Sequence, residues 1–433
     1  MTGSTESSCC TESEGPVPRM WTVDEHLADV LGQITPLPAI ELQLLDAQGC
    51  RLVEDVVATG DLPPFDNSSM DGYAVRTADT VGATSQYPSV LTVIGDIAAG
   101  AGDLPKVGPG QAARIMTGAP MPPGAEAVAP VEWTDGGTGT GRAADSMGAP
   151  VADEEVRVLQ PVSEGAHIRR RGSDIATGDE VLTAGTLLGP TQLGLLAAIG
   201  RGTVRVRPRP RVVVLSTGSE LVQPGDPVGP GQISDSNSFT LTAAALDAGA
   251  IAYRVGGVPD DAAVLRAVLE DQFGRADLIV TSGGVSVGAY DVVKEVFESY
   301  GGVDFRRLRM QPGKPQGFGR IGDGVPLLAL PGNPVSAYIS FELFVRPVIR
   351  TMLGAPDIHR PVVRAVCAAE LRSPAGRRQF LRGWYSDGFV RPIGGEGSHL
   401  VGALAKANCL IVVPESVTSV PADSTVDVVL LTG

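Results

Sequence analysis

The sequence predicts a multidomain α/β protein organised around a mostly parallel β-sheet. Between Pro208 and Gly354, short runs rich in Val, Ile and Leu alternate with segments of helical spacing. Such alternation is typical of parallel strands whose faces are covered by helices. On both sides of this region, short strand-like runs are separated by Gly and Pro. Because 433 residues exceed what a single core usually holds, we expect several domains.

The strands expected in the central region are runs of aliphatic residues, at 211–216, 251–256, 277–281, 303–309 and 326–330. The helices between them are expected to begin near Ser236, Asp260, Asp291 and Pro334. Each helix is followed by a glycine suited to a left-handed C-cap, at Gly249, Gly274, Gly301 and Gly354. Residues 310–319, after the fourth strand, are expected to form a stiff Pro/Gly loop.

The flanking regions predict smaller units. Residues 63–150 favour a small all-β domain, and the residues after 354 favour a small barrel or sandwich. The Gly-rich stretch 134–150 resembles a phosphate loop, but it has no strand-then-helix frame and no Lys-Ser/Thr ending. A flexible hairpin tip is therefore the favoured interpretation. Residues 1–18, rich in Ser, Glu, Gly and Pro, are expected to form a disordered tail.

Charge and hydropathy exclude several classes of protein. The formal net charge is −15, so we expect no binding to nucleic acid or to anionic membranes. No apolar run reaches the roughly 18 residues of a membrane-spanning helix. The five cysteines lack metal-ligand spacing and the N-terminus lacks a signal-peptide pattern, which favours a cytoplasmic location. An anionic substrate would then need local cations, and the expected cluster is Arg169, Arg170 and Arg171.

Three loops that follow strands of the central region have an unusual composition. Ligands of open parallel sheets bind at the carboxyl ends of the strands. Small residues allow close approach to the backbone, and hydroxyl and amide groups can hold phosphate. These loops therefore predict a phosphorylated or nucleotide-like ligand. The residues expected to contact it are Ser216, Thr217, Gly218, Ser282, Gly283, Gly284 and Ser286.

Charged residues near the same edge suggest further roles. Glu220, Asp260 and Asp291 are candidate ligands for Mg²⁺, whereas helix N-capping is the alternative for the two aspartates. Lys314 is suited to binding an oxyanion. In the segment 64–76, Asp71 is either a turn-forming residue or a ligand contact.

Seven segments together resemble the MoeA family, which includes the E-domain of gephyrin and of plant Cnx proteins. They are PFDNSSMDGYAVR, RIMTGAPMPPGAEAV, IRRRGSDI, STGSEL, TSGGVSVGAYD, PGKP and LPGNPVSAY, and they occur in the family's order from about Trp21 onward. The resemblance implies a homodimer whose active cleft lies between subunits. It also implies a discontinuous N-terminal dimerisation domain, an inserted β domain, a three-layer α/β domain resembling molybdopterin adenylyltransferases, and a C-terminal β-barrel. The corresponding boundaries are 19–62 with 151–192, 63–150, 193–355 and 356–433.

The reaction implied by the resemblance joins molybdate to adenylylated molybdopterin and releases AMP, with Mg²⁺ as the metal. Matched residue by residue, one set occupies functionally sensitive polar positions: Asp71, Thr117, Asp174, Glu220, Asp260 and Asp291. A second set matches the molybdate pocket and the loop above it: Lys314, Ser336, Arg377, Ser398, Pro331 and Pro334. The expected protein partners are an upstream molybdopterin adenylyltransferase and downstream molybdoenzyme chaperones.

This chain departs from the family pattern at three positions. Gln311 and Arg307 stand where lysine is common, and Ser173 stands where an acid is frequent. The first replacement removes a positive charge from the expected anion pocket. The alternatives to an insertase are an inactive or specialised paralogue that acts as a molybdopterin-binding scaffold, and a molybdopterin adenylyltransferase.

Overall fold

The structure is a computed structural model, and it describes residues 19–147, 154–284 and 292–431. Two predicted ligand contacts, Ser286 and Asp291, and the predicted tail at 1–18 lie outside the described residues. The chain forms two compact units. The first comprises Met1–Glu41, Gly49–Val53 and Arg205–Gly433, and the second comprises Leu42–Gln48 and Glu54–Val204. Within the described ranges, no helix is both long and apolar enough to cross a membrane.

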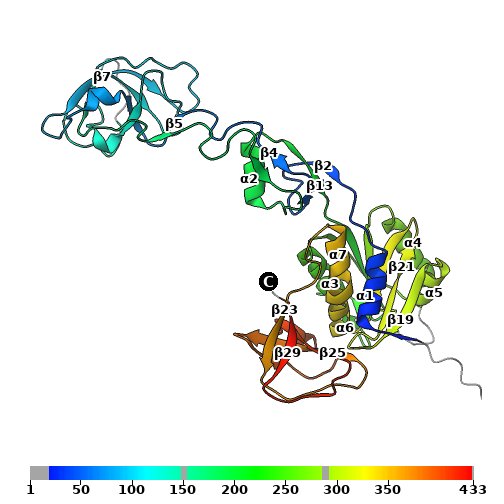
Figure 1. Ribbon diagram of the computed structural model, residues 1–433. Coiled ribbons are helices and arrows are strands. Elements are labelled where there is room, and N and C mark those ends of the chain that lie inside the picture. Colours follow the sequence, from blue (N-terminus) through cyan, green and yellow to red (C-terminus); the bar gives the residue numbers. More distant parts are fainter. Residues whose placement is uncertain (1–18, 148–153, 285–291, 432–433) are drawn as a thin grey trace, which may run out of the picture. The chain divides into compact units, whose positions relative to one another are not determined.

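The first unit contains a seven-stranded sheet that is mostly parallel, as predicted (Figure 1). Its strands, in spatial order, are β1 (Met20–Trp21), β19 (Val303–Leu308), β21 (Pro315–Ile321), β22 (Val325–Leu330), β18 (Leu278–Ser282), β14 (Arg211–Thr217) and β17 (Ile251–Val258). Only β21 runs antiparallel to its neighbours. The central strands are buried on both faces, which explains their nearly continuous aliphatic sequences.

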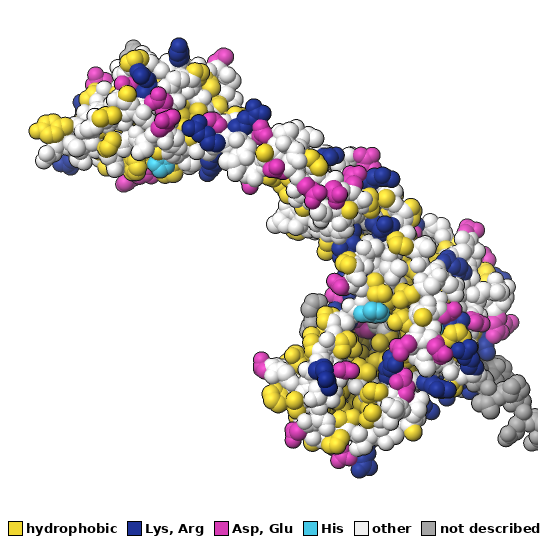
Figure 2. All heavy atoms as spheres, in the orientation of Figure 1, with side chains coloured by type: hydrophobic (Ala, Val, Ile, Leu, Met, Phe, Trp, Pro, Cys, Tyr) yellow, Lys and Arg dark blue, Asp and Glu magenta, His cyan; other side chains and the backbone are white. Residues whose placement is uncertain are grey.

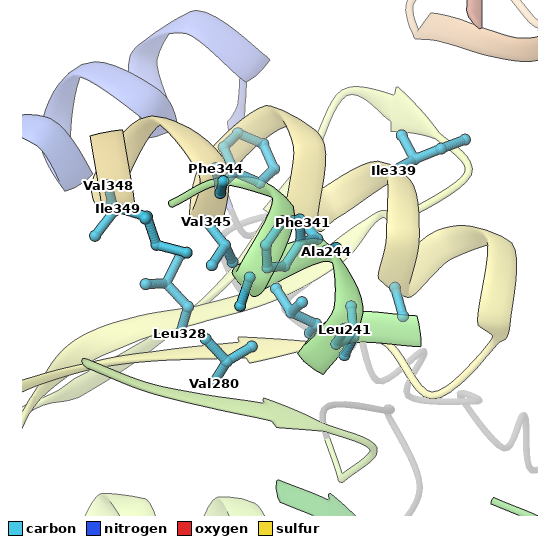
Figure 3. Packing of buried hydrophobic residues seen from close by; sticks show 14 of the residues in the cluster. Leu241, Ala244, Val280, Leu328, Ile339, Phe341, Phe344, Val345, Val348 and Ile349 are labelled. Carbon is cyan, nitrogen blue, oxygen red and sulfur yellow. The ribbon is translucent and has the colours of Figure 1, made fainter. Parts of the chain in front are cut away.

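Helices cover both faces of this sheet and make three layers. They are α1 (Val23–Gly32), α3 (Asn237–Asp247), α4 (Ala262–Gln272), α5 (Val292–Ser299), α6 (Pro334–Ser340) and α7 (Arg346–Met352), with a π-helical turn at Phe341–Val345 between the last two. Figure 3 shows Leu241 of α3 and Phe341 packed over Val280 and Leu328 of the sheet. On the opposite face, α4 and α5 enclose a second apolar cluster.

Two local expectations for this unit were wrong, and the N-capping alternative for Asp260 does not hold. Residues 315–319, part of the expected loop 310–319, belong to strand β21. Gly317 and Gly319 have low strand propensity, but they allow the neighbouring backbone to approach closely. A Cβ atom at Gly319 would lie 1.8 Å from the carbonyl oxygen of Gly302. The N-cap of α4 is Asp261 rather than Asp260, since the Asp261 carboxylate accepts hydrogen bonds from two amides of the first turn. Gly274 does not adopt a left-handed conformation, whereas the other three expected C-cap glycines do.

The C-terminal residues of the first unit form a closed β-barrel. Its strands are β20 (Met310–Gln311), β25 (Arg378–Ser386), β26 (Phe389–Pro392), β23 (Val362–Cys367), β29 (Ser424–Leu430) and β27 (Cys409–Val413). The ring closes because β25 pairs with both β26 and β27. Strand β20 joins the barrel from the loop that follows β19, and it pairs in parallel with β25. This connection brings residues 310–314 next to the barrel.

The second unit contains a small five-stranded sheet, which agrees with the β-rich prediction. Its order is β10 (Glu155–Val158), β7 (Ser89–Ile97), β8 (Gln111–Ile115), β6 (Gly72–Val75) and β9 (Ala127–Pro130). The chain enters and leaves this sheet through paired segments, β5 (Asn67–Ser68) with β11 (Ile168–Arg169), and β4 (Val56–Val57) with β12 (Glu180–Leu182). The unit also contains α2 (Pro190–Ala198).

The Gly-rich stretch of this unit folds around a buried carboxylate. Asp135 is fully buried, and it accepts hydrogen bonds from the amides of Gly137, Gly141 and Arg157. The Arg157 guanidinium adds an ion pair at 3.4 Å. The amides that would hold a phosphate therefore already bind the protein's own anion, which supports the rejection of a phosphate loop here.

Candidate functional site

The three unusual loops of the α/β sheet leave it at one edge, as the sequence predicted. Ser216 at the end of β14 is in register with Ser282 at the end of β18. Ser282 is in turn in register with Leu330 at the end of β22. Because these strands are parallel neighbours, their carboxyl ends place the following loops side by side.

Hydroxyl groups at this edge are buried, and some have no partner. Ser216 is 1% exposed and Thr217 is 6% exposed, yet neither side-chain hydroxyl forms a hydrogen bond within the described part of the chain. An unsatisfied buried polar group costs about 1–3 kcal/mol. Such groups persist at functional sites, where a ligand or ion can satisfy them. Ser216 and Thr217 are therefore candidates for ligand contact.

Glycine is required where the first two loops touch. Gly283 has a φ of +103°, and a Cβ atom there would lie 2.7 Å from the Thr217 carbonyl oxygen. A side chain would force the two loops apart. Gly218 and Gly284 also have positive φ angles, so the backbone of both loops is shaped by glycine. The contact supports the prediction that these loops act together.

Two of the three predicted acidic residues come together beside the first loop. The Asp260 carboxylate accepts a hydrogen bond from the Ser219 amide at 3.1 Å, and the Ser219 hydroxyl accepts one from the Asp260 amide at 3.1 Å. Glu220 follows directly, and both carboxyl residues are exposed. Within the described ranges, no cluster of three or more His, Cys, Asp or Glu is placed to hold a metal ion. The predicted third ligand, Asp291, lies outside those ranges.

A cavity of about 540 Å³ lies between the α/β layers and the barrel loops of the first unit. We call it the Lys314 cavity. Five of the six residues matched to the molybdate pocket line it, and they are Lys314, Pro331, Ser336, Arg377 and Ser398. Pro334 is not among the lining residues. The remaining lining residues are Met310, Gln311, Pro312, Gly313, Pro315, Gly332, Asn333, Glu396 and Gly397.

The charges in the Lys314 cavity suit an anion. Lys314 and Arg377 are half-buried, and neither forms an ion pair with any described residue. The Arg377 Nη1 donates a hydrogen bond of 3.4 Å to the Gln311 Oε1. Gln311 therefore contacts the guanidinium through a carbonyl oxygen, where a lysine would repel it. Glu396 is the acidic lining residue, whereas Arg307 is exposed on β19 and does not line the cavity.

Buried polar residues hold the loops around this cavity. The Gln316 side-chain amide donates to the Gly313 carbonyl at 2.7 Å and to the Ser340 hydroxyl at 2.6 Å. Arg382 of β25, which is also buried, donates to the carbonyl of Gly395. Gln316 and Arg382 were not expected from the sequence. Both strands contain other polar residues, Arg320 in β21 and Arg378 in β25, so no local signal distinguishes these two.

A second cavity, of about 590 Å³, lies in the second unit. We call it the Asp71 cavity. The Asp71 Oδ1 accepts hydrogen bonds from the Thr117 amide at 2.7 Å and from the Thr117 hydroxyl at 2.9 Å. Two predicted site residues from distant segments are thus in direct contact. The lining residues are Met70, Asp71, Arg114, Met116, Thr117, Val131, Glu132, Asp145, Ser146 and Met147.

The remaining predicted site features of the second unit lie elsewhere. Asp174 is exposed and lines neither cavity, and its amide donates to the Leu62 carbonyl. Of the expected arginine cluster, Arg170 pairs with Asp66 at 2.7 Å, and Arg171 pairs with Asp61. Cations and acids also lie near one another on the face shown in Figure 2. Two of the three arginines are therefore paired with carboxylates, and the gathering of an anionic substrate by this run stays a prediction.

Three family models together match most of the chain. A model for the "MoeA N-terminal region (domain I and II)" matches residues 21–200. A "probable molybdopterin binding domain" matches residues 213–351. A model for the "MoeA C-terminal region (domain IV)" matches residues 364–431.

Similar proteins match over nearly their whole length. Molybdopterin molybdenumtransferase 2 of Mycobacterium tuberculosis is 47% identical over 417 residues, covering 94% of this chain and 99% of that protein. The molybdopterin molybdenumtransferase of Haemophilus influenzae is 35% identical, covering 94% of this chain and 98% of that protein. Among solved structures, the molybdopterin biosynthesis MoeA protein from Pyrococcus horikosii superimposes with a TM-score of 0.71 at 32% identity. That match covers 96% of this chain and 100% of the other.

Proposed function

Because this chain belongs to the MoeA family of molybdopterin molybdenumtransferases, enzymes of molybdenum cofactor biosynthesis, we propose that it inserts molybdate into adenylylated molybdopterin. The proposed products are the molybdenum-loaded pterin and AMP. The two dithiolene thiols lose their protons to one molybdate oxygen, which leaves as water. A second water molecule cleaves the phosphoanhydride bond, so atoms balance across the reaction.

One observation supports this function most directly. The loop that follows β22 starts at the carboxyl end of the parallel strands and also lines the Lys314 cavity. Leu330 ends the strand, and Pro331 and Gly332 are lining residues of the cavity. The proposed site for a phosphorylated ligand and the proposed site for an oxyanion thus share a loop of one compact unit. This adjacency is what the insertion of molybdate into a nucleotide-linked pterin requires.

The residues of the first unit suggest distinct tasks. Lys314 and Arg377 would bind the molybdate dianion, with hydrogen bonds from the hydroxyls of Ser336 and Ser398. At the sheet edge, the unpartnered hydroxyls and the glycine-shaped backbone would bind the phosphates. Both sets of groups are positioned by strands and helices, which preserves their geometry.

The proposed magnesium ion fits the acidic residues at the first loop. Glu220 and Asp260 offer carboxylate oxygens, the ligands that Mg²⁺ prefers, and both face solvent where an ion can enter. The Ser219–Asp260 hydrogen bonds hold Asp260 against the residue that precedes Glu220. When bound, Mg²⁺ would neutralise phosphate charge. We assign Asp291 to the same set from the family match alone.

The remaining expectations stay proposals. We propose a homodimer in which Asp71 and Thr117 act in a cleft shared between subunits. The four-domain boundaries and the adenylyltransferase and chaperone partners are proposed from the family resemblance, and the cytoplasmic location is proposed from the cysteine usage and the N-terminal sequence. A functionally sensitive role for Asp174 has no support from a cavity, and it rests on the family match.

The deciding experiment measures AMP release from adenylylated molybdopterin by the purified protein. Four reactions are compared, with and without molybdate and with and without Mg²⁺. Release that requires both, with a product that reconstitutes a molybdoenzyme, supports the insertase. A protein that binds the nucleotide but never releases AMP is a scaffold. A protein that forms adenylylated molybdopterin from ATP is the adenylyltransferase.

A further inference from the structure

Asn237, the first residue of α3, connects the loops that follow strands β18 and β22. Its side-chain amide nitrogen donates to the Ser282 hydroxyl at 2.7 Å and to the Gly332 carbonyl at 2.7 Å. Both amide hydrogens are therefore used. Asn237 was not expected from the sequence, because its hydrogen-bond partners follow two strands that lie far from it in the chain.

The two partners of Asn237 belong to different parts of the proposed site. Ser282 begins the loop assigned to phosphate, and Gly332 lines the Lys314 cavity. The loops are also in direct contact, because a Cβ atom on Gly332 would lie 3.5 Å from the Cα of Gly283. Asn237 thus links Ser282, which is assigned to phosphate binding, to the Lys314 cavity through hydrogen bonds.

The helix start that carries Asn237 is itself fixed. Asp235 is 1% exposed, and its carboxylate accepts hydrogen bonds from the Ser238 amide at 3.1 Å and the Ser238 hydroxyl at 2.5 Å. The Arg254 guanidinium lies 4.0 Å from the same carboxylate. A rigid anchor that holds two loops restricts each loop to positions compatible with the other.

We propose that Asn237 is a positioning residue that couples nucleotide binding at Ser282–Gly284 to oxyanion binding in the Lys314 cavity. The inference rests on the proposed function and adds an energetic link between its two sites. A ligand that binds at Ser282 acts on Gly332 through the Asn237 side-chain amide. Occupation of one site then changes the affinity of the other, and this coupling is reciprocal.

The test measures the dissociation constant of molybdate by calorimetry, with and without saturating AMP. In the wild-type protein we expect AMP to change this constant about fivefold or more. Asn237→Ala removes both hydrogen bonds, and Asn237→Leu removes them while keeping the approximate shape. In both variants we expect the ratio of the molybdate dissociation constants measured without and with AMP to fall to about one.

The matched control is Asn408→Ala. Asn408 is also half-buried, and its side chain forms two hydrogen bonds with the backbone of Tyr385 at 2.7 and 2.9 Å, away from both cavities. This variant should lose stability but keep the wild-type ratio, which separates coupling from a general structural effect.

Two results would overturn the inference. One is wild-type protein that binds both ligands without any change in affinity, and the other is an Asn237 variant that folds and keeps the wild-type ratio. Both leave the proposed function intact, because molybdate and AMP still bind. Failure of the wild-type protein to bind molybdate at all is a different result, and it removes the proposed function together with the inference.

Discussion

Lys314 provides the sharpest test of the oxyanion cavity. The substitution Lys314→Met removes the ammonium charge and keeps most of the aliphatic stem, so packing against the cavity wall is largely preserved. Lys314 has no ion pair among the described residues, and its charge is therefore available to a ligand. We expect weaker molybdate binding with little change in stability.

The size of the effect follows from the contact that is lost. A hydrogen bond to a charged group contributes about 1.5–3 kcal/mol. Since about 1.4 kcal/mol corresponds to a tenfold change, the dissociation constant should rise about 10- to 150-fold. Lys314 is only half-buried, so water screens part of its charge, and we expect a value in the lower half of this range.

Calorimetric titration with molybdate, at two ionic strengths, checks this prediction. The matched control is Lys406→Met, which changes an exposed lysine of the same unit that lines neither cavity. Its molybdate affinity should equal that of wild type. A molybdate dissociation constant for Lys314→Met within twofold of wild type would refute the assignment of Lys314 to the anion.

Three further substitutions test other parts of the protein. Asp71→Asn keeps an oxygen that can accept both Thr117 hydrogen bonds but removes the charge, so turnover should fall at least about 100-fold while the melting temperature changes little; normal AMP release would exclude Asp71 from the site. Glu342→Gln removes the buried carboxylate that pairs with both Arg346 and Arg360 and leaves them only the more exposed Asp247, so urea titration should show a decrease of about 3 kcal/mol in the free energy of unfolding; a decrease below about 1 kcal/mol would contradict a tightly coupled cluster. Burial lowers the pKa of His26 to about 4, so the unfolded chain gains a proton first as the pH falls below about 6.5. Relative to His26→Leu, wild-type stability should therefore decrease by roughly 2–3 kcal/mol between pH 7 and pH 4.5, and parallel pH profiles would disprove a buried neutral imidazole.

Much of the α/β unit could be predicted because its signals are local. Aliphatic runs such as 211–216 and 326–330 mark strands that are buried on both faces. Parallel strands place their carboxyl ends on one edge, so the alignment of Ser216 with Ser282 followed from the strand assignment itself. Apart from Lys314, the family resemblance rather than the local sequence supplied the predicted residues of the Lys314 cavity.

The incorrect expectations have a common physical origin. Strand β21 was missed because its glycines are suited to close packing against β19, a contact that no local pattern reveals. From the sequence, Asp260 and Asp261 are equally plausible N-caps for α4. The Ser219 amide binds the Asp260 carboxylate, and Asp261 is the residue that caps the helix. The carboxylates that pair with Arg170 and Arg171 were likewise not expected, because they lie about a hundred positions earlier in the chain.

The sequence by itself determined the alternation of strands and helices in the α/β region. It also determined that three loops follow the carboxyl ends of parallel strands, and that Lys314 offers a positive charge to an anion. These properties depend on residue type and on spacings of a few residues, where backbone geometry is regular. Tertiary structure alone decided that Gln311 contacts Arg377, that Asn237 joins Ser282 to Gly332, and that strand β20 brings Lys314 beside the barrel. Each of these contacts joins residues that are far apart in the chain. The distance between such residues depends on how the sheet, the helices and the barrel pack together, which no local pattern in the sequence reveals.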